Sequence, residues 1–345
     1  RMKNALTFDI EEYFHAEAFS GVVRPEDWAG LESRGVDSTQ RLLDILDREQ
    51  VRATFFVLGW VAERHPALVR EIESLGHEIA CHGYAHRMIQ HLNRHEFAED
   101  VKRAKKVLED IAGTSVIGYR APTFSVVRET LWSLDILAEA GFRYDSSIFP
   151  VRHDRYGIPD APRFPHRVRT AGGGEIAEFP LSTICLPGWR LQVAGGGYFR
   201  LFPLAWTCWA IRRLNEREGQ PAIVYLHPWE IDPDQPRLPV GRITRFRHLV
   251  NVDRTEGKLH RLLLDFLELG LRRHTGREHQ CAQRDRHQPR GTLQSPMHLL
   301  PCHLTRSACH HHTISSINFV PCPRNSPVLP VHLTRQFPRD MVRTG

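Results

Sequence analysis

The sequence predicts an α/β protein in which a parallel sheet is covered by helices on its outside. Over residues 1–272, short runs of β-branched and aromatic residues alternate with longer segments in which apolar residues recur at helical spacing. Glycine stands directly after three of these longer segments, where it can end a helix in the left-handed conformation. Six or seven β–α units result, and such units form parallel sheets because each helix returns the chain to the same edge.

The elements follow from these patterns in chain order. Strands are predicted at 5–10, 52–58, 78–81, 116–119, 176–179 and 222–226. Helices are predicted at 37–50, 66–75, 96–111, 129–140, 204–217 and 256–269. Asp37, Ser38 and Thr39 offer a cap to the first helix. Residues 146–200 are rich in Pro, Arg and Gly and are expected to be mostly loop.

Length and composition exclude two classes of protein. The chain has 345 residues, of which 41% are apolar and 25% are charged, so it can bury a large core and is not disordered as a whole. No run approaches eighteen consecutive apolar residues, and no apolar signal stretch follows the first residues. We therefore expect no integral membrane segment and no secretion, with the cytoplasm or the inner face of its membrane as the location.

The positive charge is confined to the end of the chain. The net charge is +6, but residues 1–272 contain 36 Lys and Arg against 37 acids, whereas residues 273–345 contain 10 Arg against 3 acids. The body is therefore nearly neutral, and no nucleic-acid partner is expected. The basic tail, 273–345, is also rich in His, Pro and Cys, and it is predicted to be disordered or frame-shifted; a basic interaction arm is the alternative. Cys81, Cys185 and Cys208 in the body show no paired spacing, which argues against a disulfide framework.

Polar residues stand where the predicted strands end. They are Asp9, Glu11, Glu12, His82, His86, Arg120, Asp145 and His227. The carboxyl ends of parallel strands lie at one edge of the sheet, where the chemistry of such folds gathers. We therefore expect these side chains to converge on one site if the sheet closes.

Two histidines and a carboxylate form a candidate metal site. His82 and His86 are four residues apart after a short strand, and two imidazoles with one carboxylate leave open positions for water and substrate. Asp9 and Glu11 face the same side of a strand, so one can bind metal while the other stays free as a base; Glu12 points away. Solvated surface histidines and a solvated acidic loop are the alternatives.

Arg120 and His227 supply the rest of a catalytic constellation. A guanidinium at a strand end can keep a carboxylate oriented and ionised through two hydrogen bonds. His227 ends an apolar strand, and it is either a core histidine with satisfied hydrogen bonds or a general acid at the cavity. Asp145 could orient His227 in the way that Arg120 orients a carboxylate.

These residues resemble the motifs of the polysaccharide deacetylase family with the NodB homology domain, over residues 4–270. The five motifs occur in the expected order, at 7–11, 82–86 (HxxxH), 120–122 (RxP), 145–147 (DxS) and 226–227 (Leu-His). The first motif departs from the usual adjacent Asp pair and has the spacing of the branch that includes cytoplasmic peptidoglycan deacetylases and cyclic-imidase-like enzymes. Thr123 stands where many members have an aromatic residue, and Phe149 stands in place of Trp.

The resemblance implies a distorted barrel of (β/α)7 type and a divalent metal that is usually zinc. It implies metal ligation by Glu11, His82 and His86, and hydrolysis of N-acetyl groups on hexosamine polymers. Asp9 would then be the base held by Arg120, and His227 would be the acid oriented by Asp145.

Four side chains are candidate substrate contacts: Tyr198, Trp229, Thr123 and Phe124. Tyr198 follows a glycine triplet that predicts a flexible loop or one with positive φ, and its ring could stack on a sugar. A tight turn with a core tyrosine is the alternative for Tyr198, and a core residue is the alternative for Trp229.

Segments 9–14, 118–122, 195–200 and 227–230 are similar to a bacterial subgroup associated with exosortase systems and exopolysaccharide gene clusters. The expected substrate is an N-acetylated polysaccharide or oligosaccharide. A cyclic imide or ureide amidohydrolase and a peptidoglycan deacetylase-like enzyme are the enzymatic alternatives. A carbohydrate-binding protein and an inactive damaged gene product are the alternatives outside enzymes. The sequence leaves the oligomeric state open.

Overall fold

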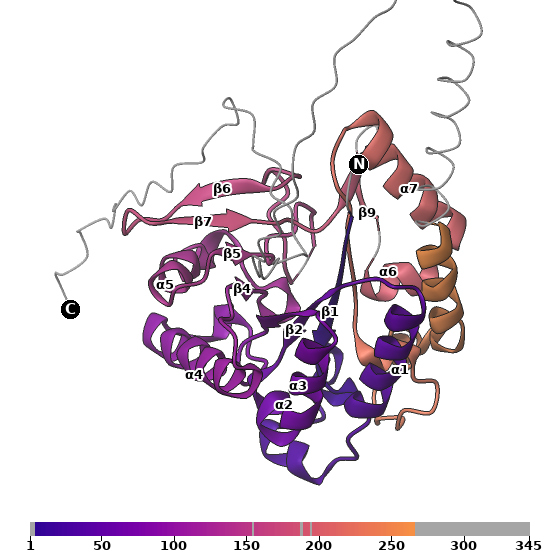
Figure 1. Cartoon of the computed structure of the whole chain (residues 1–345), viewed down its shortest axis with the longest axis horizontal. Helices are drawn as coiled ribbons and strands as arrows, with labels where there is room; N and C mark the ends of the chain where they lie inside the picture. Colours follow the sequence, from indigo (N-terminus) through magenta and orange to yellow (C-terminus); the bar gives the residue numbers. More distant parts are fainter. Residues whose placement is uncertain (1–3, 154, 187–188, 194, 266–345) are drawn as a thin grey trace, which may run out of the picture.

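The computed structural model describes residues 4–265 apart from 154, 187, 188 and 194, and these residues form a curved sheet with helices on its outside (Figure 1). The sheet has eight strands in the order β10-β1-β2-β3-β4-β5-β7-β6, and β8 and β9 form a separate hairpin. The strands are β1 (Ala5–Ile10), β2 (Thr54–Val57), β3 (Glu78–Cys81), β4 (Gly118–Tyr119), β5 (Tyr144–Asp145), β6 (His166–Arg169), β7 (Glu175–Glu178), β8 (Thr183–Leu186), β9 (Trp189–Gln192) and β10 (Ile223–Leu226).

Helices surround the outer side of the sheet, with α1 to α5 following β1 to β5 around its curve (Figure 1). They are α1 (Gly35–Arg48), α2 (Gly59–Arg64), α3 (Pro66–Ser74), α4 (Arg94–Ala112), α5 (Ser133–Glu139), α6 (Gly196–Leu201), α7 (Leu204–Arg217) and α8 (Arg242–Leu249). A further helix is described over 252–265.

The predicted α/β class and barrel-like curvature are confirmed, in the form of a half-barrel. Neighbouring strands from β10 to β7 are all parallel, and β6 pairs antiparallel with β7. The strand order is linear, so β10 and β6 are the two edges of the sheet. The series of parallel strands therefore stops at β7, with the antiparallel β6 beside it, and the sheet does not close onto β10.

The helix α4 shows how local sequence sets the limits of an element. Asn93 Oδ1 accepts a hydrogen bond from the Glu96 N–H at 3.0 Å, and Glu96 Oε2 accepts one from the Asn93 N–H at 2.9 Å. This reciprocal cap satisfies two backbone donors that the first turn leaves free. The helix ends at Gly113, whose φ of 69° places it in the left-handed region.

Residues 146–200 are mostly loop, as predicted, and the strand predicted at 176–179 is β7, but the strands β6, β8 and β9 and the helix α6 were not predicted. Each of these strands has only four residues. Pairing between chain segments stabilises such short strands, and their own sequence carries little periodic signal. The same limit explains why α2 and α8, of six and eight residues, were not predicted.

One large apolar cluster contains residues from almost the whole length of the described chain. It runs in sequence from Leu6 to Leu263 and includes residues of α1, α4 and α7. The predicted boundary at 272 and the tail 273–345 lie outside the described residues. Within the part of the chain that the structure describes, Cys81, Cys185 and Cys208 form no disulfide.

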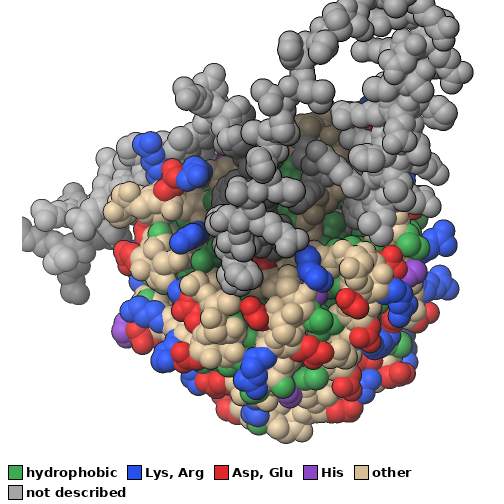
Figure 2. Space-filling model, viewed as in Figure 1, with side chains coloured by type: hydrophobic (Ala, Val, Ile, Leu, Met, Phe, Trp, Pro, Cys, Tyr) green, Lys and Arg blue, Asp and Glu red, His purple; other side chains and the backbone are tan. Residues whose placement is uncertain are grey.

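The surface of the described residues agrees with a nearly neutral body. On the face drawn in Figure 2, acidic and basic side chains are interspersed and form no large field of one sign. Among the helices of residues 4–265, none has the length and apolar character required to cross a bilayer.

Candidate active site

The carboxyl ends of four strands bring five predicted side chains together. Asp9 lies in β1 and Glu11 follows it, while His82, Arg120 and His227 directly follow β3, β4 and β10. The strand β1 pairs with both β10 and β2, and β3 pairs with both β2 and β4. These parallel neighbours end at one edge of the sheet, so residues more than 200 positions apart in the chain meet there.

Glu11, His82 and His86 form a cluster of metal-type ligands. One ligand atom from each lies within 4.8 Å of the others. Glu11 Oε2 lies 2.5 Å from His86 Nε2 and 3.9 Å from His82 Nε2. This oxygen is buried and accepts no hydrogen bond from the described residues. A buried carboxylate oxygen that lacks a donor and faces two imidazole nitrogens fits a divalent cation, which such ligands hold at roughly 2 Å.

The surroundings favour the metal-binding forms of Glu11 and His82. Burial by itself raises the pKa of Glu11, but interactions with His86, His227 and His82 outweigh burial and lower the pKa below its usual value. Burial lowers the pKa of His82 to about 4, so its ring is neutral. His82 Nδ1 lies 2.9 Å from the Arg120 carbonyl oxygen, which only accepts hydrogen bonds. The proton therefore sits on Nδ1, and the Nε2 lone pair faces Glu11.

The loop that carries His86 is fixed by a residue that the sequence reasoning missed. Asp100 in α4 accepts hydrogen bonds from the backbone N–H groups of Tyr84 at 2.7 Å and Ala85 at 3.2 Å. Gly83 has a φ of 73°, and a Cβ there would lie 3.1 Å from Asp100 Oδ2. The loop can therefore approach the carboxylate because position 83 has no side chain. Asp100 looks in sequence like any surface acid of a charged helix.

Arg120 is fully buried and holds Asp9. Its Nη1 donates to Asp9 Oδ1 at 2.7 Å and to Thr7 Oγ1 at 2.8 Å, so it binds the carboxylate through one nitrogen and not through the expected two. Its Nε and Nη2 donate to the backbone oxygen and hydroxyl of Ser146 at 3.1 and 2.9 Å. The guanidinium carbon also lies 4.0 Å from the centre of the Phe56 ring. Arg120 is thus fixed on several sides, and Ser146 is a second residue that sequence reasoning missed.

The prediction that Asp145 orients His227 is wrong. The partner is Glu230, whose Oε2 lies 3.2 Å from His227 Nδ1. Asp145 lies in β5, which four strands separate from β10 in the sheet. His227 Nε2 faces the site, 3.9 Å from Asp9 Oδ2 and 3.7 Å from Glu11 Oε1. Burial alone lowers the pKa of His227, but the Glu11, Glu230 and Asp9 carboxylates outweigh burial and raise it to about 9.

Asp145 instead supports the backbone beside Arg120. Its Oδ1 accepts a hydrogen bond from Ser147 Oγ at 2.5 Å, and Ser147 Oγ accepts one from the Ala121 N–H at 2.8 Å. Glu178, also fully buried, accepts from the Ile148 N–H at 3.0 Å. Burial raises the pKa of both Asp145 and Glu178, and the neighbouring Asp145 raises that of Glu178 further.

Trp229 is not an open platform for sugar rings. It is 7% exposed, and its indole stacks on His227 at 4.9 Å and on His248 at 4.3 Å between ring centres. Its Nε1 donates to Glu11 Oε1 at 3.1 Å. Trp229 therefore orients a residue of the metal-type cluster, because an indole N–H beside a carboxylate fixes the direction of that group.

The other candidate substrate contacts differ from one another. Phe124 is buried, with its ring 5.5 Å from Phe149 and 4.8 Å from Tyr225, so its ring packs in an apolar cluster. Thr123 is half-buried and has a φ of 55°, which is a strained backbone conformation for threonine. Tyr198 is 36% exposed at the start of α6, so its predicted contact with substrate stays a prediction.

Comparisons with known proteins agree with this arrangement. The half-barrel with metal-type ligands at its strand ends indicates an α/β protein whose catalytic site lies at the carboxyl ends of the strands. Residues 5–144 match the family model described as polysaccharide deacetylase, and residues 146–269 match a domain of unknown function, DUF3473. Residues 5–144 are therefore similar to polysaccharide deacetylases, as the motifs predict for that part of the chain.

Two relatives and one solved structure illustrate the similarity. A peptidoglycan-N-acetylglucosamine deacetylase of Bacillus cereus is 30% identical over 40% of this chain and 54% of its own length. A chitooligosaccharide deacetylase of Sinorhizobium fredii is 33% identical over 29% of this chain and 44% of its own. The chain thus matches about half the length of these relatives. The crystal structure of a polysaccharide deacetylase-like protein from Mycobacterium smegmatis has 23% identity and a TM-score of 0.51, covers 85% of this chain and 94% of its own, and shows the same fold.

Proposed function

We propose that the protein is a metal-dependent hydrolase that removes acetyl groups from N-acetylated hexosamines in a polysaccharide or oligosaccharide. The observation that carries this proposal is the grouping of the Glu11, His82 and His86 cluster with the Asp9–Arg120 ion pair and with His227. A cation site, a base and an acid are what metal-assisted amide hydrolysis uses. We also propose that the two matched halves act as one catalytic unit.

Glu11, His82 and His86 would hold the cation. We favour zinc, because one carboxylate and two imidazoles are a usual ligand set of catalytic zinc sites and leave room for further ligands. A divalent cation held there supplies a Lewis acid that polarises the acetyl carbonyl and makes a nearby water more acidic.

Asp9 is the base in this proposal. Its Oδ1 is occupied by the hydrogen bond from Arg120, so Oδ2 is the oxygen that takes a proton from the attacking water. Arg120 keeps Asp9 aimed before the reaction. Because Ser146 and Thr7 hold the guanidinium, it stays in place when the charge of Asp9 changes.

His227 is the acid. Its Nδ1 is turned to Glu230, so a proton on Nε2 is the one presented to the site. As the C–N bond breaks, this proton passes to the departing amine nitrogen, and acetate and a free amine leave. The His227 side chain is 16% exposed, which allows it to regain a proton from solvent.

The substrate class rests on the relatives. Their names give peptidoglycan N-acetylglucosamine and chitooligosaccharides as substrates, and both contain N-acetylated hexosamine. The predicted role in exopolysaccharide biosynthesis and the exosortase-associated subgroup remain part of this proposal. The segments 195–200 and 227–230, which carry much of that resemblance, lie within the match to DUF3473. The cytoplasmic location also stays a prediction.

The test is acetate release from N-acetylglucosamine oligomers by the full chain. Release should stop on treatment with a chelator and return when zinc is restored. Asp9→Asn should bind one metal per chain and lower kcat by roughly 10² to 10⁴-fold, the usual contribution of a positioned base. Metal content is measured alongside acetate for each sample.

Two results would contradict the proposal. One is full activity after complete removal of metal. The other is an absence of acetate release from every N-acetylhexosamine oligomer by a protein with one metal bound, together with opening of a cyclic imide, which would favour the amidohydrolase alternative.

A further inference from the structure

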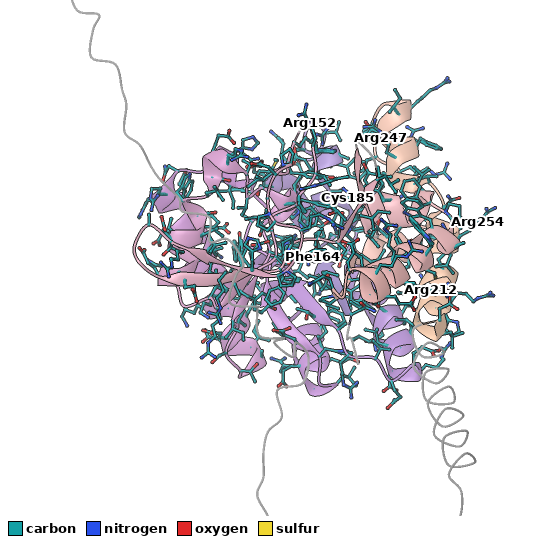
Figure 3. The ribbon with its side chains drawn as sticks, turned by 90° about the horizontal axis from the view of Figure 1, so that it is seen from above. Arg152, Phe164, Cys185, Arg212, Arg247 and Arg254 are labelled. Atoms are coloured by element: carbon teal, nitrogen blue, oxygen red, sulfur yellow. The ribbon has the colours of Figure 1, made fainter. Side chains whose placement is uncertain are left out.

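The region matched only by a domain of unknown function contributes a buried arginine close to the site. Arg200 in α6 is 2% exposed. By contrast, Arg212 and Arg254 from the neighbouring helices project from the surface (Figure 3). Burial of a guanidinium is costly unless its charge is paired and its donors are satisfied, so Arg200 requires an explanation.

Arg200 is fixed on both sides. Its Nε donates to Glu230 Oε1 at 2.7 Å. Its Nη1 donates to the backbone oxygens of His248 at 2.6 Å and Val250 at 3.2 Å, and its Nη2 donates to that of Arg247 at 3.1 Å. These oxygens lie at the carboxyl end of α8, where carbonyl groups lack helical partners and attract a cation. The end of α8 therefore holds the guanidinium, and the guanidinium holds Glu230.

Glu230 uses both of its oxygens. Oε1 accepts from Arg200, while Oε2 accepts from the His227 backbone N–H at 3.0 Å and lies 3.2 Å from His227 Nδ1. A carboxylate only accepts hydrogen bonds, so the facing Nδ1 must carry a proton. This fixes both the ring orientation and the identity of the nitrogen, Nε2, that faces Asp9 and Glu11.

We propose that the Arg200–Glu230 ion pair is the positioning unit for His227, and that supplying this unit is a role of residues 146–269. This inference rests on the proposed function, because it assumes that His227 delivers a proton to the departing amine. Arg200 and Glu230 act through His227 and do not touch the substrate. The loss of either should therefore affect the protonation of the leaving group more than substrate binding.

Leaving-group chemistry separates positioning from general structural support. The amine of an acetamide leaves only with a proton, whereas 4-nitrophenolate leaves readily without one. In Glu230→Gln we expect kcat for the N-acetylglucosamine oligomer to fall by about 10²-fold, with little change in KM. A misplaced catalytic group typically lowers the rate by about this factor. Hydrolysis of 4-nitrophenyl acetate by the same variant should change by less than about 3-fold. Arg200→Lys, which keeps the charge but loses the planar fork, should show the same selective loss to a smaller extent.

The matched control is Glu218→Gln. Glu218 pairs with Arg163 at 2.7 Å in the same half of the chain, away from the site. This variant should keep both activities and one metal per chain. If Glu230→Gln fails to bind metal or to unfold cooperatively, Glu230→Asp, which keeps the charge, takes its place with the same two substrates.

The outcomes are distinguishable. A wild-type chain that releases no acetate refutes the proposed function, and the inference falls with it. An active wild type with an unaffected Glu230→Gln, or with equal losses on the two substrates, overturns the inference alone.

Discussion

Trp229 shows how one side chain can fix two functional groups. Its N–H binds Glu11 Oε1 at 3.1 Å while its ring stacks on His227 at 4.9 Å. A group that directs a metal ligand typically contributes 10-fold to 100-fold in metal affinity. The buried indole therefore fits a role in orienting Glu11 and His227, and this role differs from the predicted contact with sugar.

At this scale we predict that Trp229→Phe weakens zinc binding by roughly 10-fold to 100-fold, because the hydrogen bond to Glu11 is lost while an aromatic ring remains for stacking. Competition with a chelator of known affinity measures the change. Trp132→Phe removes an indole that packs on Phe97, remote from the cluster, and should leave zinc affinity unchanged. Equal affinity of Trp229→Phe and wild type would show that the hydrogen bond does not direct Glu11.

Glu11 and Glu12 are neighbours with different tasks. Glu11 belongs to the metal-type cluster, whereas Glu12 turns away and binds the start of α1. Glu12 accepts hydrogen bonds from Ser33 Oγ at 2.5 Å and from the N–H groups of Arg34 and Gly35 at 2.9 Å each. The alternation of sides along the strand was predicted from sequence, but the helix that receives Glu12 was not.

At the scale of the element, we predict that Glu12→Ala destabilises the protein by about 2 kcal/mol, because buried donors at the start of α1 lose their acceptor. Urea unfolding measures the change. Metal content should stay at one per chain, in contrast to Glu11→Ala, which should lose the metal. Asn93→Ala, which removes the exposed cap of α4, should cost about 1 kcal/mol. A Glu12→Ala variant as stable as wild type would exclude the capping role.

The glycines of the segment 195–200 show why an element boundary can depend on a distant residue. Gly195 has a φ of 145°, and a Cβ there would lie 2.0 Å from a ring carbon of Tyr225. The positive φ predicted for this triplet is confirmed at Gly195 and Gly196. The close approach to β10 sets the start of α6 and so the position of Arg200, and no local pattern reveals this contact.

Buried histidines make the stability of the whole molecule depend on pH. His77 is 5% exposed, its Nδ1 accepts a hydrogen bond from the Ala53 N–H at 3.2 Å, and its buried Nε2 has no hydrogen-bond partner among the described residues. Burial, with a smaller contribution from Arg52, lowers the pKa of His77 to about 4. In the unfolded chain a histidine has a pKa of about 6.5, so between these two values the unfolded state binds more protons.

We therefore predict that the free energy of unfolding of the metal-free protein falls as pH drops from about 6.5 to about 4, with His77 contributing about 1 kcal/mol per pH unit. His77→Asn, whose amide oxygen can replace Nδ1 as the acceptor, should reduce this slope. Urea unfolding at several pH values in the presence of a chelator measures it. An unchanged slope in the variant would show that His77 already binds a proton in the folded state.

The sequence alone was sufficient for the class of fold and for most of the site. Asp9, Glu11, His82, Arg120 and His227 could be predicted to meet because each is fixed by a local strand pattern, and parallel strands bring their carboxyl ends to one edge. The pairing of Glu230 with His227 could also have been predicted from the sequence. Glu230 stands three residues after His227, at the position from which a side chain folds back on a helix start.

Only the tertiary structure decided the partners of buried polar groups that lie far apart in the sequence. Arg200 and Glu230 are 30 residues apart in sequence, Trp229 and Glu11 are 218 apart, and Arg120 and Ser146 are 26 apart. A buried donor or acceptor must be paired, but the identity of its partner depends on which segments the packing places within about 3 Å. The spacing of residues along one strand or helix carries no information about such long-range contacts.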